Sequence, residues 1–258
     1  LIILFLLHTA GLIFRWYISG HAPWSDAYES MIYVAWATMA IGLYFAKRSP
    51  ISLASTAFIT SMILMIAHWN WLDPSIGTLQ PVLNSYWLMI HVAVIVGSYG
   101  PFALGMILGI INLFLIIFTN KKNIKIKAII KELSIVNELS LTVGLIMLTI
   151  GNFLGAQWAN ESWGRYWGWD PKETWALVSI MVYAFVVHMR IVPGLRGSWA
   201  FNFMSVASFA SIIMTYFGVN FYLSGLHSYA SGEKVITPNF VYYAVVFVIL
   251  LGIISFFR

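Results

Sequence analysis

Long unbroken apolar stretches fill this chain, and short polar segments separate them. A helix needs about 20 mostly apolar residues to cross a bilayer, so we expect eight membrane spans. Gly100-Pro101 interrupts the fourth stretch, which is also the longest, and favours a kink there. The pattern predicts an all-α fold, a polytopic transmembrane helical bundle that forms a single membrane domain over residues 1–258. The predicted spans are 1–17, 27–46, 51–69, 86–118, 136–156, 172–190, 199–219 and 240–257.

Composition agrees with a membrane protein and excludes thiol chemistry by this chain. Of its 258 residues, 60% are hydrophobic and 9% are charged, whereas a soluble domain carries about 25% charged residues. The absence of cysteine excludes disulfides, thiolate metal sites, iron–sulfur clusters and a cysteine nucleophile. The chain begins at Leu1 inside an apolar run that no basic segment precedes. We therefore expect a fragment or processed piece of a longer protein rather than a signal peptide.

The loop charges predict the orientation through the excess of basic residues on the cytoplasmic side. With eight spans, ten of the 14 basic residues fall on one side, with Glu132 and Glu138 as its acids. The other side has four basic residues and seven acidic ones. The net positive charge of the chain therefore indicates its orientation in the membrane rather than nucleic-acid binding. The outer face then consists of 18–26, 70–85, 157–171 and 220–239. The ten inner basic residues are Lys47, Arg48, Lys121, Lys122, Lys125, Lys127, Lys131, Arg190, Arg196 and Arg258.

Tryptophan is concentrated in one outer segment, residues 157–175. Its indoles offer flat apolar faces with a polar edge, and Gly164 and Gly168 favour tight turns between them. Two interpretations stay open, an interfacial aromatic belt and a platform for a large flat ligand. Asp170 and Glu173 are interpreted as an N-cap and its capping-box partner at the start of the sixth span rather than as catalytic acids. The five tryptophans are Trp158, Trp163, Trp167, Trp169 and Trp175.

Histidines are the main candidate metal ligands in a chain without cysteine. His91 is predicted roughly 8 Å below the outer end of the fourth span, and His227 lies in the last outer loop. His188 is predicted roughly 25 Å down the sixth span, so one metal centre cannot use it together with the other two. For His8, near mid-span, we expect a hydrogen bond to a backbone carbonyl. His21 and His68 lie at outer helix ends and receive no role.

Two imidazoles beside flat aromatic walls favour an iron porphyrin as the ligand. Arg165, Lys172 and the open N–H groups at the start of the sixth span can receive its propionates. Zinc is the competing metal, but a catalytic zinc site usually has three protein ligands.

Five ordered motifs, spread over about residues 10–230, resemble the CcsA (ResC) family of system II cytochrome c biogenesis. The segment WGRYWGWDPKETWAL from Trp163 resembles the tryptophan-rich WWD signature of haem-handling proteins. The others are RWYISGHAPWSDAYES from Arg15, SYWLMIHV from Ser85, VHMR from Val187 and GVNFYLSGLHSY from Gly218.

This resemblance implies a cytochrome c haem lyase that carries haem b (iron protoporphyrin IX) outward and attaches it to a Cys-x-x-Cys-His apocytochrome c. It implies a CcsB (ResB) partner, separate or fused, in a bacterial inner or thylakoid-type membrane. His91 and His227 match the axial ligands of an external haem. His188 matches a ligand of a second haem within the membrane, whose other ligand comes from the CcsB part. The implied WWD residues are Trp158, Trp163, Arg165, Tyr166, Trp167, Trp169, Asp170 and Lys172.

The apocytochrome supplies both thiols, so this chain needs no cysteine, and no catalytic residue is assigned beyond the haem ligands. We expect the chain to act by positioning, which makes the approach of thiol and haem effectively intramolecular. Three alternatives remain: an electron-transferring b-type cytochrome, a system I haem-delivery protein and a solute transporter. A b-type cytochrome usually places its histidine pairs inside the bilayer, and the motifs outside the WWD segment disfavour the system I type. A transporter predicts no bound porphyrin.

Overall fold

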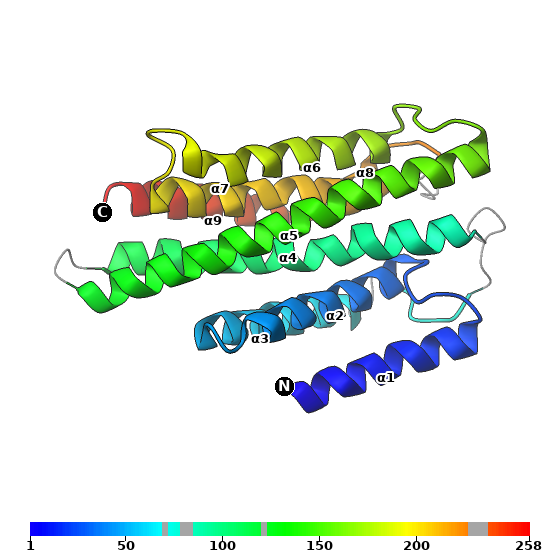
Figure 1. Ribbon diagram of the computed structural model, residues 1–258, viewed down its shortest axis with the longest axis horizontal. Helices are drawn as coiled ribbons and strands as arrows, with labels where there is room; N and C mark the ends of the chain where they lie inside the picture. Colours follow the sequence, from blue (N-terminus) through cyan, green and yellow to red (C-terminus); the bar gives the residue numbers. More distant parts are fainter. Residues whose placement is uncertain (69–71, 78–84, 120–122, 227–236) are drawn as a thin grey trace. The chain divides into compact units, whose positions relative to one another are not determined.

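The computed structural model of this chain describes residues 1–68, 72–77, 85–119, 123–226 and 237–258. In this part of the chain every regular element is helical (Figure 1), which confirms the predicted all-α polytopic bundle. The elements are α1 (Ile2–Ser19), α2 (Ala27–Phe45), α3 (Pro50–His68), α4 (Tyr86–Phe118), α5 (Ile124–Trp163), α6 (Pro171–His188), η2 (Met189–Ile191), α7 (Ser198–Ile213), η3 (Met214–Gly218), α8 (Val219–Tyr222) and α9 (Asn239–Phe256).

Seven of the eight predicted spans are long and apolar enough to cross a membrane, counted over the described residues. The eighth, α2, does not qualify because polar residues such as Glu29 and Thr38 lower its mean hydropathy. Both of these side chains are buried. Helix α2 is 19 residues long, the same length as α3, and it packs along that helix. At their contact a Cβ on Gly42 would overlap the side chain of Thr56, so the two backbones approach closely.

Helix α5 is much longer than its predicted span, residues 136–156. It runs for 40 residues from Ile124 to Trp163, about 60 Å at 1.5 Å per residue. The first part contains lysine and glutamate, which favour helices although they are unfavourable in lipid. At the other end the helix continues into the tryptophan cluster. The predicted outer loop 157–171 is therefore corrected to the short connection 164–170 between α5 and α6.

Helix α4 continues unbroken through Pro101, with the bounds that its apolar run predicts. Gly100 lies where α4 meets α2: a Cβ there would lie 2.7 Å from the backbone nitrogen of Thr38. Only a residue without a side chain allows this approach, so Gly100 serves helix packing.

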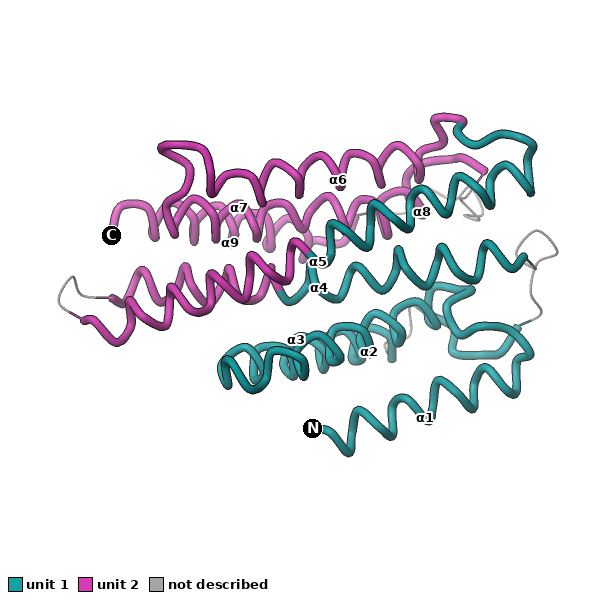
Figure 2. Tube along the Cα trace, in the orientation of Figure 1, with its two compact units in different colours: residues 1–104, 143–167 teal, residues 105–142, 168–258 magenta. Residues whose placement is uncertain are grey.

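The chain divides into two compact units (Figure 2), and α4 and α5 contribute to both. Unit 1 contains residues 1–104 and 143–167, and unit 2 contains residues 105–142 and 168–258. The tryptophan cluster is thus divided at residue 167. The single membrane domain over residues 1–258 stays a prediction.

Glycines on α5 bring that helix close to α4 inside unit 1. A Cβ on Gly144 would lie 2.8 Å from the ring of Phe102. Further along, a Cβ on Gly155 would lie 3.2 Å from the ring of His91. Association of helices in lipid depends on such close packing because apolar burial adds little there. His91 is consequently held against the α5 backbone.

A fully buried polar cluster joins α4, α5 and α7 inside unit 2. The amide nitrogens of Asn112 and Asn137 donate to the Asn202 side-chain oxygen over 2.9 and 3.2 Å. The Asn202 amide nitrogen donates to Ser134 Oγ (2.9 Å) and to the Ser198 carbonyl (2.7 Å). Asn202 is therefore the centre of a hydrogen-bonded network that three helices share.

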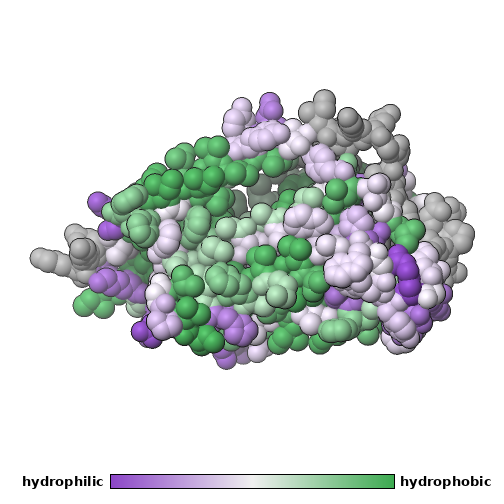
Figure 3. Space-filling view, turned by 90° about the horizontal axis from the view of Figure 1, so that it is seen from above, coloured by the Kyte–Doolittle hydropathy of each residue, from purple (hydrophilic) through white to green (hydrophobic). Residues whose placement is uncertain are grey.

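Large apolar side chains cover much of the surface (Figure 3), as expected where lipid is the solvent. Helix α1 exposes Ile3, Leu7 and Phe14, among others, and α9 exposes Tyr243 and Ile254. Both helices qualify as membrane spans. A polar contact joins α1 to α2: Trp36 Nε1 donates to Thr9 Oγ1 on α1 over 2.8 Å.

Asn202→Ala is expected to destabilise unit 2 by about 2 kcal/mol, because it leaves the buried amides of Asn112 and Asn137 without their shared acceptor. Thermal unfolding followed by intrinsic tryptophan fluorescence measures the effect. Ser211→Ala on the same helix is the control, since the Ser211 hydroxyl donates only to the Ser208 carbonyl of its own helix. Equal melting temperatures for both variants would contradict the central role of Asn202.

Candidate functional site

His91 lies against a wall of aromatic side chains in unit 1. Its ring stacks on the indole of Trp158, with 5.2 Å between ring centroids and 24° between ring planes. Trp158 is 1% exposed and meets Trp163 edge to face at 4.7 Å. The extension of α5 beyond its predicted span positions both indoles. The structure therefore joins His91 to the first two members of the tryptophan cluster.

The hydrogen bond of the His91 ring indicates which nitrogen is suited to bind a metal. Nδ1 lies 3.1 Å from the carbonyl oxygen of Trp87, one turn earlier on α4. A carbonyl only accepts hydrogen bonds, so this contact assigns the proton to Nδ1 and the lone pair to Nε2. Histidine ligands of metals are usually oriented by such a bond. An imidazole lone pair beside flat indole walls fits an iron porphyrin.

Arg165 brings a positive charge to the same wall. Its guanidinium carbon lies 5.8 Å from the ring centroid of Trp163, within the range of a cation–π interaction. Two further predicted haem-binding residues follow it in unit 1, Tyr166, which is 58% exposed, and Trp167, which is half-buried. Unit 1 thus contains one predicted axial ligand, its aromatic support and a candidate cation for a propionate.

The remainder of the tryptophan segment begins α6 in unit 2, with the cap that the sequence predicts. The Asp170 carboxylate accepts from the backbone N–H of Lys172 at 3.2 Å, and Glu173 Oε2 accepts from the backbone N–H of Asp170 at 3.2 Å. The same Glu173 oxygen accepts from the Gly168 N–H at 2.8 Å. Pro171 occupies the first helical turn. The interpretation of Asp170 and Glu173 as capping residues is confirmed.

Trp169 adopts a left-handed backbone conformation, with φ of 57°. This conformation costs a non-glycine residue about 1–2 kcal/mol. Its side chain is nevertheless 71% exposed, so core burial does not offset the cost. Strained residues of this kind gather at functional sites, which makes the Trp169 indole a candidate contact for a ligand.

Asp170 also holds the segment that leads to His227. Its Oδ1 accepts a hydrogen bond from the backbone N–H of Leu226 over 2.6 Å. Gly225 permits this approach, because a Cβ there would lie 2.7 Å from Pro171 Cδ and would overlap the Asp170 carboxylate. His227, the next residue, lies outside the described residues. Its pairing with His91 stays a prediction.

Lys172 is the second residue of α6, and its Nζ donates to Asn220 Oδ1 at 3.2 Å. This bond joins α6 to α8 within unit 2. The five-residue π-helix η3 directly precedes α8 and contributes Thr215, whose hydroxyl lies 2.9 Å from that of Ser179 on α6. Lys172, a predicted partner of a haem propionate, is thus bonded to the α8 segment that leads to Leu226.

His188 ends α6, at the opposite end of that 18-residue helix from Asp170. Its side chain is exposed, and Nδ1 lies 2.7 Å from the carbonyl oxygen of Ala184. The same tautomer argument as for His91 assigns the lone pair to Nε2. Beside it, the Arg190 guanidinium pairs with Glu138 on α5 over 2.8 Å. His188 thus belongs to a different region from the Asp170 end of α6.

The other histidines form no metal centre: no group of three or more His, Asp or Glu side chains in the described ranges can hold an ion together. The His8 ring has a buried Nε2 and a backbone hydrogen bond to Ile32, as expected for this residue. His21 Nδ1 lies 3.2 Å from Ser25 Oγ and 3.9 Å from Glu29. His68 is exposed at the end of α3.

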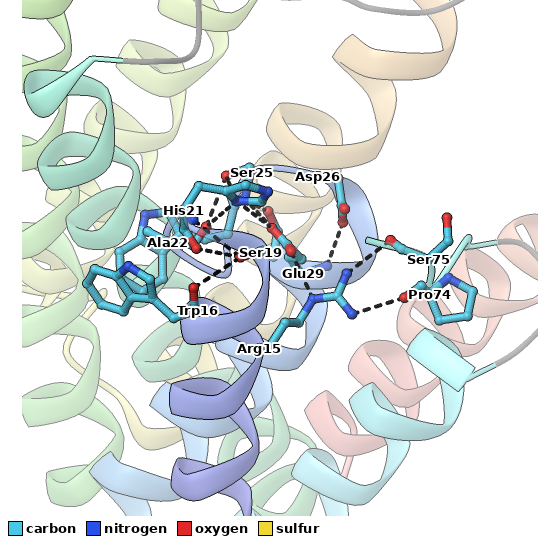
Figure 4. A network of polar contacts seen from close by, with 12 residues as sticks. Arg15, Trp16, Ser19, His21, Ala22, Ser25, Asp26, Glu29, Pro74 and Ser75 are labelled. Atoms are coloured by element: carbon cyan, nitrogen blue, oxygen red, sulfur yellow. Dashed lines mark hydrogen bonds and ion pairs between the residues drawn. The ribbon is translucent and has the colours of Figure 1, made fainter. Parts of the chain in front are cut away.

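Sequence reasoning missed the polar network around Arg15 (Figure 4). Arg15 Nε donates to Glu29 Oε1 at 2.8 Å, and Glu29 is fully buried. The nearby Asp26 caps α2, and partial desolvation by the surrounding segments raises the pKa of that carboxyl. An arginine at the end of an apolar run followed by an Asp-x-x-Glu cap was the available signal, but it does not show that Arg15 and Glu29 pair.

Comparison with known proteins gives consistent matches. A family model described as cytochrome C assembly protein matches residues 24–227. Protein NrfI of Wolinella succinogenes is 50% identical over 231 residues, covering 90% of this chain and 26% of NrfI. Cytochrome c biogenesis protein CcsA of Prochlorococcus marinus (strain MIT 9312) is 35% identical, covering 87% of this chain and 81% of that protein. CcsA of Solanum lycopersicum is 34% identical, with 90% and 84% covered. The chain therefore spans about a quarter of NrfI and about four fifths of CcsA.

Gly225→Ala is expected to break the bond between Asp170 and Leu226, because the added methyl group would occupy the space of the carboxylate. Hydrogen exchange at the Leu226 amide should accelerate about tenfold or more, as a charge-assisted hydrogen bond is lost. Gly77→Ala is the control, because nothing lies within 4 Å of a Cβ at Gly77. Unchanged protection of Leu226 in Gly225→Ala would show that Asp170 does not hold this segment.

Proposed function

We propose, from the premise that this chain belongs to the cytochrome c assembly protein family, that it presents haem for covalent attachment to an apocytochrome c. The observation that carries the proposal is the environment of His91. A buried imidazole, with its proton directed to a carbonyl, stacks on Trp158 in a wall that also contains Trp163. Haem b, iron protoporphyrin IX, is the proposed substrate.

His91 and His227 are the proposed axial ligands of this haem. The bond from Leu226 to Asp170 supports a defined start for the segment that contains His227. Trp169, exposed on a strained backbone, is proposed to contact the porphyrin face. Arg165 and Lys172 are proposed to receive the propionates, which require cations where water is scarce.

The proposed reaction adds each cysteine S–H of the apocytochrome across a vinyl C=C of haem. The sulfur bonds to one vinyl carbon and the proton goes to the other, so no leaving group or oxidant is needed. This chain supplies no thiol, in agreement with its lack of cysteine. Its proposed contribution is to hold the vinyl edge where the thiols arrive, so that the addition becomes effectively intramolecular.

His188 is proposed to bind a second haem within the membrane. Its exposure at the end of α6 supports a ligand that acts together with another polypeptide. A CcsB-type protein or fused domain is the proposed partner. The site of attachment is proposed to lie on the extracytoplasmic side of a bacterial inner or thylakoid-type membrane.

His91→Gly is expected to lower haem occupancy of the purified protein about tenfold or more, measured by the Soret absorption per polypeptide. Free imidazole should restore it, because the ligand enters the space of the lost side chain. His68→Gly, which removes an exposed histidine of the same unit, is the control. The proposal fails if wild-type protein purified with a CcsB-type partner binds no haem, or if His91→Gly keeps normal occupancy and holocytochrome yield.

His188→Gly is expected to decrease holocytochrome c formation about tenfold or more in cells, because haem supply through the membrane is interrupted. Haem added to the purified variant should still bind in a manner that depends on His91. Phe185→Ala, an exposed substitution one turn earlier on α6, is the control. Normal holocytochrome formation in His188→Gly would exclude its role in supply.

A further inference from the structure

The segment from Arg15 to Tyr33 contains a prominent sequence motif to which the proposed function gives no role. Arg15 is its centre (Figure 4): besides the bond to Glu29, its two terminal nitrogens donate to the carbonyls of Pro74 and Ser75 over 2.9 and 3.1 Å. Glu29 is 0% exposed, so loss of Arg15 would leave a buried carboxyl group without its cationic partner. Arg15 thereby fixes the end of α1, the start of α2 and the segment after α3 relative to one another.

The second oxygen of Glu29 extends this order to Trp24. Glu29 Oε2 accepts from the backbone N–H of Ser25 at 2.9 Å. The Trp24 backbone N–H donates to the Ala22 carbonyl at 2.9 Å, and its own carbonyl accepts from Ser30 Oγ at 3.3 Å. Ser25, the residue after Trp24, is therefore bonded directly to the ion pair of Arg15 and Glu29, and the Trp24 backbone is bonded to Ala22 and Ser30.

Trp24 and Tyr33 reach α4 on both sides of His91. Trp24 Nε1 donates to the Met89 carbonyl at 3.1 Å, and the Tyr33 hydroxyl donates to the Ala93 carbonyl at 3.3 Å. These two carbonyls lie two residues before and two residues after His91. The ring centroids of Trp24 and Tyr33 are 4.8 Å apart, so the two donor side chains also pack against each other.

These bonds are not needed to form α4, since helix carbonyls already accept from amides one turn later. They join α4 to the connection before α2 and to α2 itself, and two such contacts four residues apart limit both rotation and sliding of α4. His91 lies between them, and its ring is packed on the opposite helix by Trp158. Groups that orient a ligand typically change metal affinity about tenfold to a hundredfold.

We infer that Trp24 and Tyr33, held by the pair of Arg15 and Glu29, are positioning residues for His91. The inference rests on the proposed function and gives this motif a part in it. The two donors set the depth and direction at which the imidazole meets the haem iron. They touch neither the haem nor the reacting thiols in this role.

The first test compares Trp24→Phe, Tyr33→Phe and the double variant in full-length protein purified with its CcsB-type partner. Transfer of bound haem to excess apomyoglobin measures retention. Transfer should accelerate about threefold for each single variant, the typical effect of one hydrogen bond between membrane helices. For the double variant the increase should be about tenfold. Protein yield should not change.

Two controls remove similar groups without touching α4. Trp36→Phe deletes an indole N–H that donates to Thr9 on α1, and Tyr44→Phe deletes an exposed hydroxyl on α2. Both should transfer haem at the wild-type rate. Equal acceleration in Tyr44→Phe and Tyr33→Phe would overturn the inference, because the loss of any hydroxyl on α2 would then explain both.

A coupling experiment separates positioning from general stability. In a His91→Gly protein supplied with imidazole, the ligand no longer depends on α4, so Trp24→Phe and Tyr33→Phe should have no further effect. If they accelerate haem transfer as much in that background as with His91 present, they do not act through His91 and the inference is wrong.

A final measurement needs no haem. Because the chain has no cysteine, His91→Cys gives a single reactive thiol at a position that is 6% exposed. Its alkylation by a maleimide should accelerate about threefold with Trp24→Phe or Tyr33→Phe, and not with the controls. Unchanged alkylation and unchanged haem transfer overturn the positioning role alone. Absence of haem from wild-type protein overturns the proposed function, and alkylation then still decides whether the two donors fix residue 91.

Discussion

The close approach of α4 and α5 within unit 1 is the constraint on which the candidate site depends. Gly144 lies against Phe102, Gly151 against Ile95 and Gly155 against His91. Because lipid is as apolar as the side chains, such contact between backbones is a main source of affinity between the helices. The same close approach of α4 and α5 packs the His91 imidazole against Trp158, which follows Gly155 within one turn of α5. The packing that stabilises this pair of helices is thus the packing that orients the ligand.

The tryptophan segment contains buried or half-buried indoles in unit 1 and an exposed indole in unit 2. Trp158 and Trp163 extend α5 and are packed behind His91, where they act as a wall. Trp169 is exposed in a strained turn, immediately before the capping box that begins α6. A single belt at the membrane surface would not require this division between buried and exposed indoles. The proposed platform for a flat ligand uses an exposed indole, because a porphyrin presents a large apolar face to it.

Polar groups buried between the helices are paired in small networks, each of which fixes a different part of the chain. Asn202 connects three helices of unit 2 through Asn112 and Asn137. Arg15 and Glu29 connect three segments of unit 1, and Trp24 and Tyr33 extend that order to the backbone around His91. An unpaired polar group in such surroundings is costly, so these networks specify one arrangement where apolar contacts alone would allow several.

The sequence by itself determined the helical class, the bounds of α4 and the cap at Asp170, because apolar run length and capping patterns depend on neighbouring residues only. It also indicated His91 beside a tryptophan cluster, partly through a resemblance of ordered motifs. It placed the ends of α5 wrongly, since helix propensity extends past the apolar run. Only the tertiary structure decided that Arg15 pairs with Glu29, that Trp24 and Tyr33 bond α4 and that Asp170 holds Leu226. Such contacts join residues from different elements, and their geometry depends on how the helices pack rather than on any local pattern.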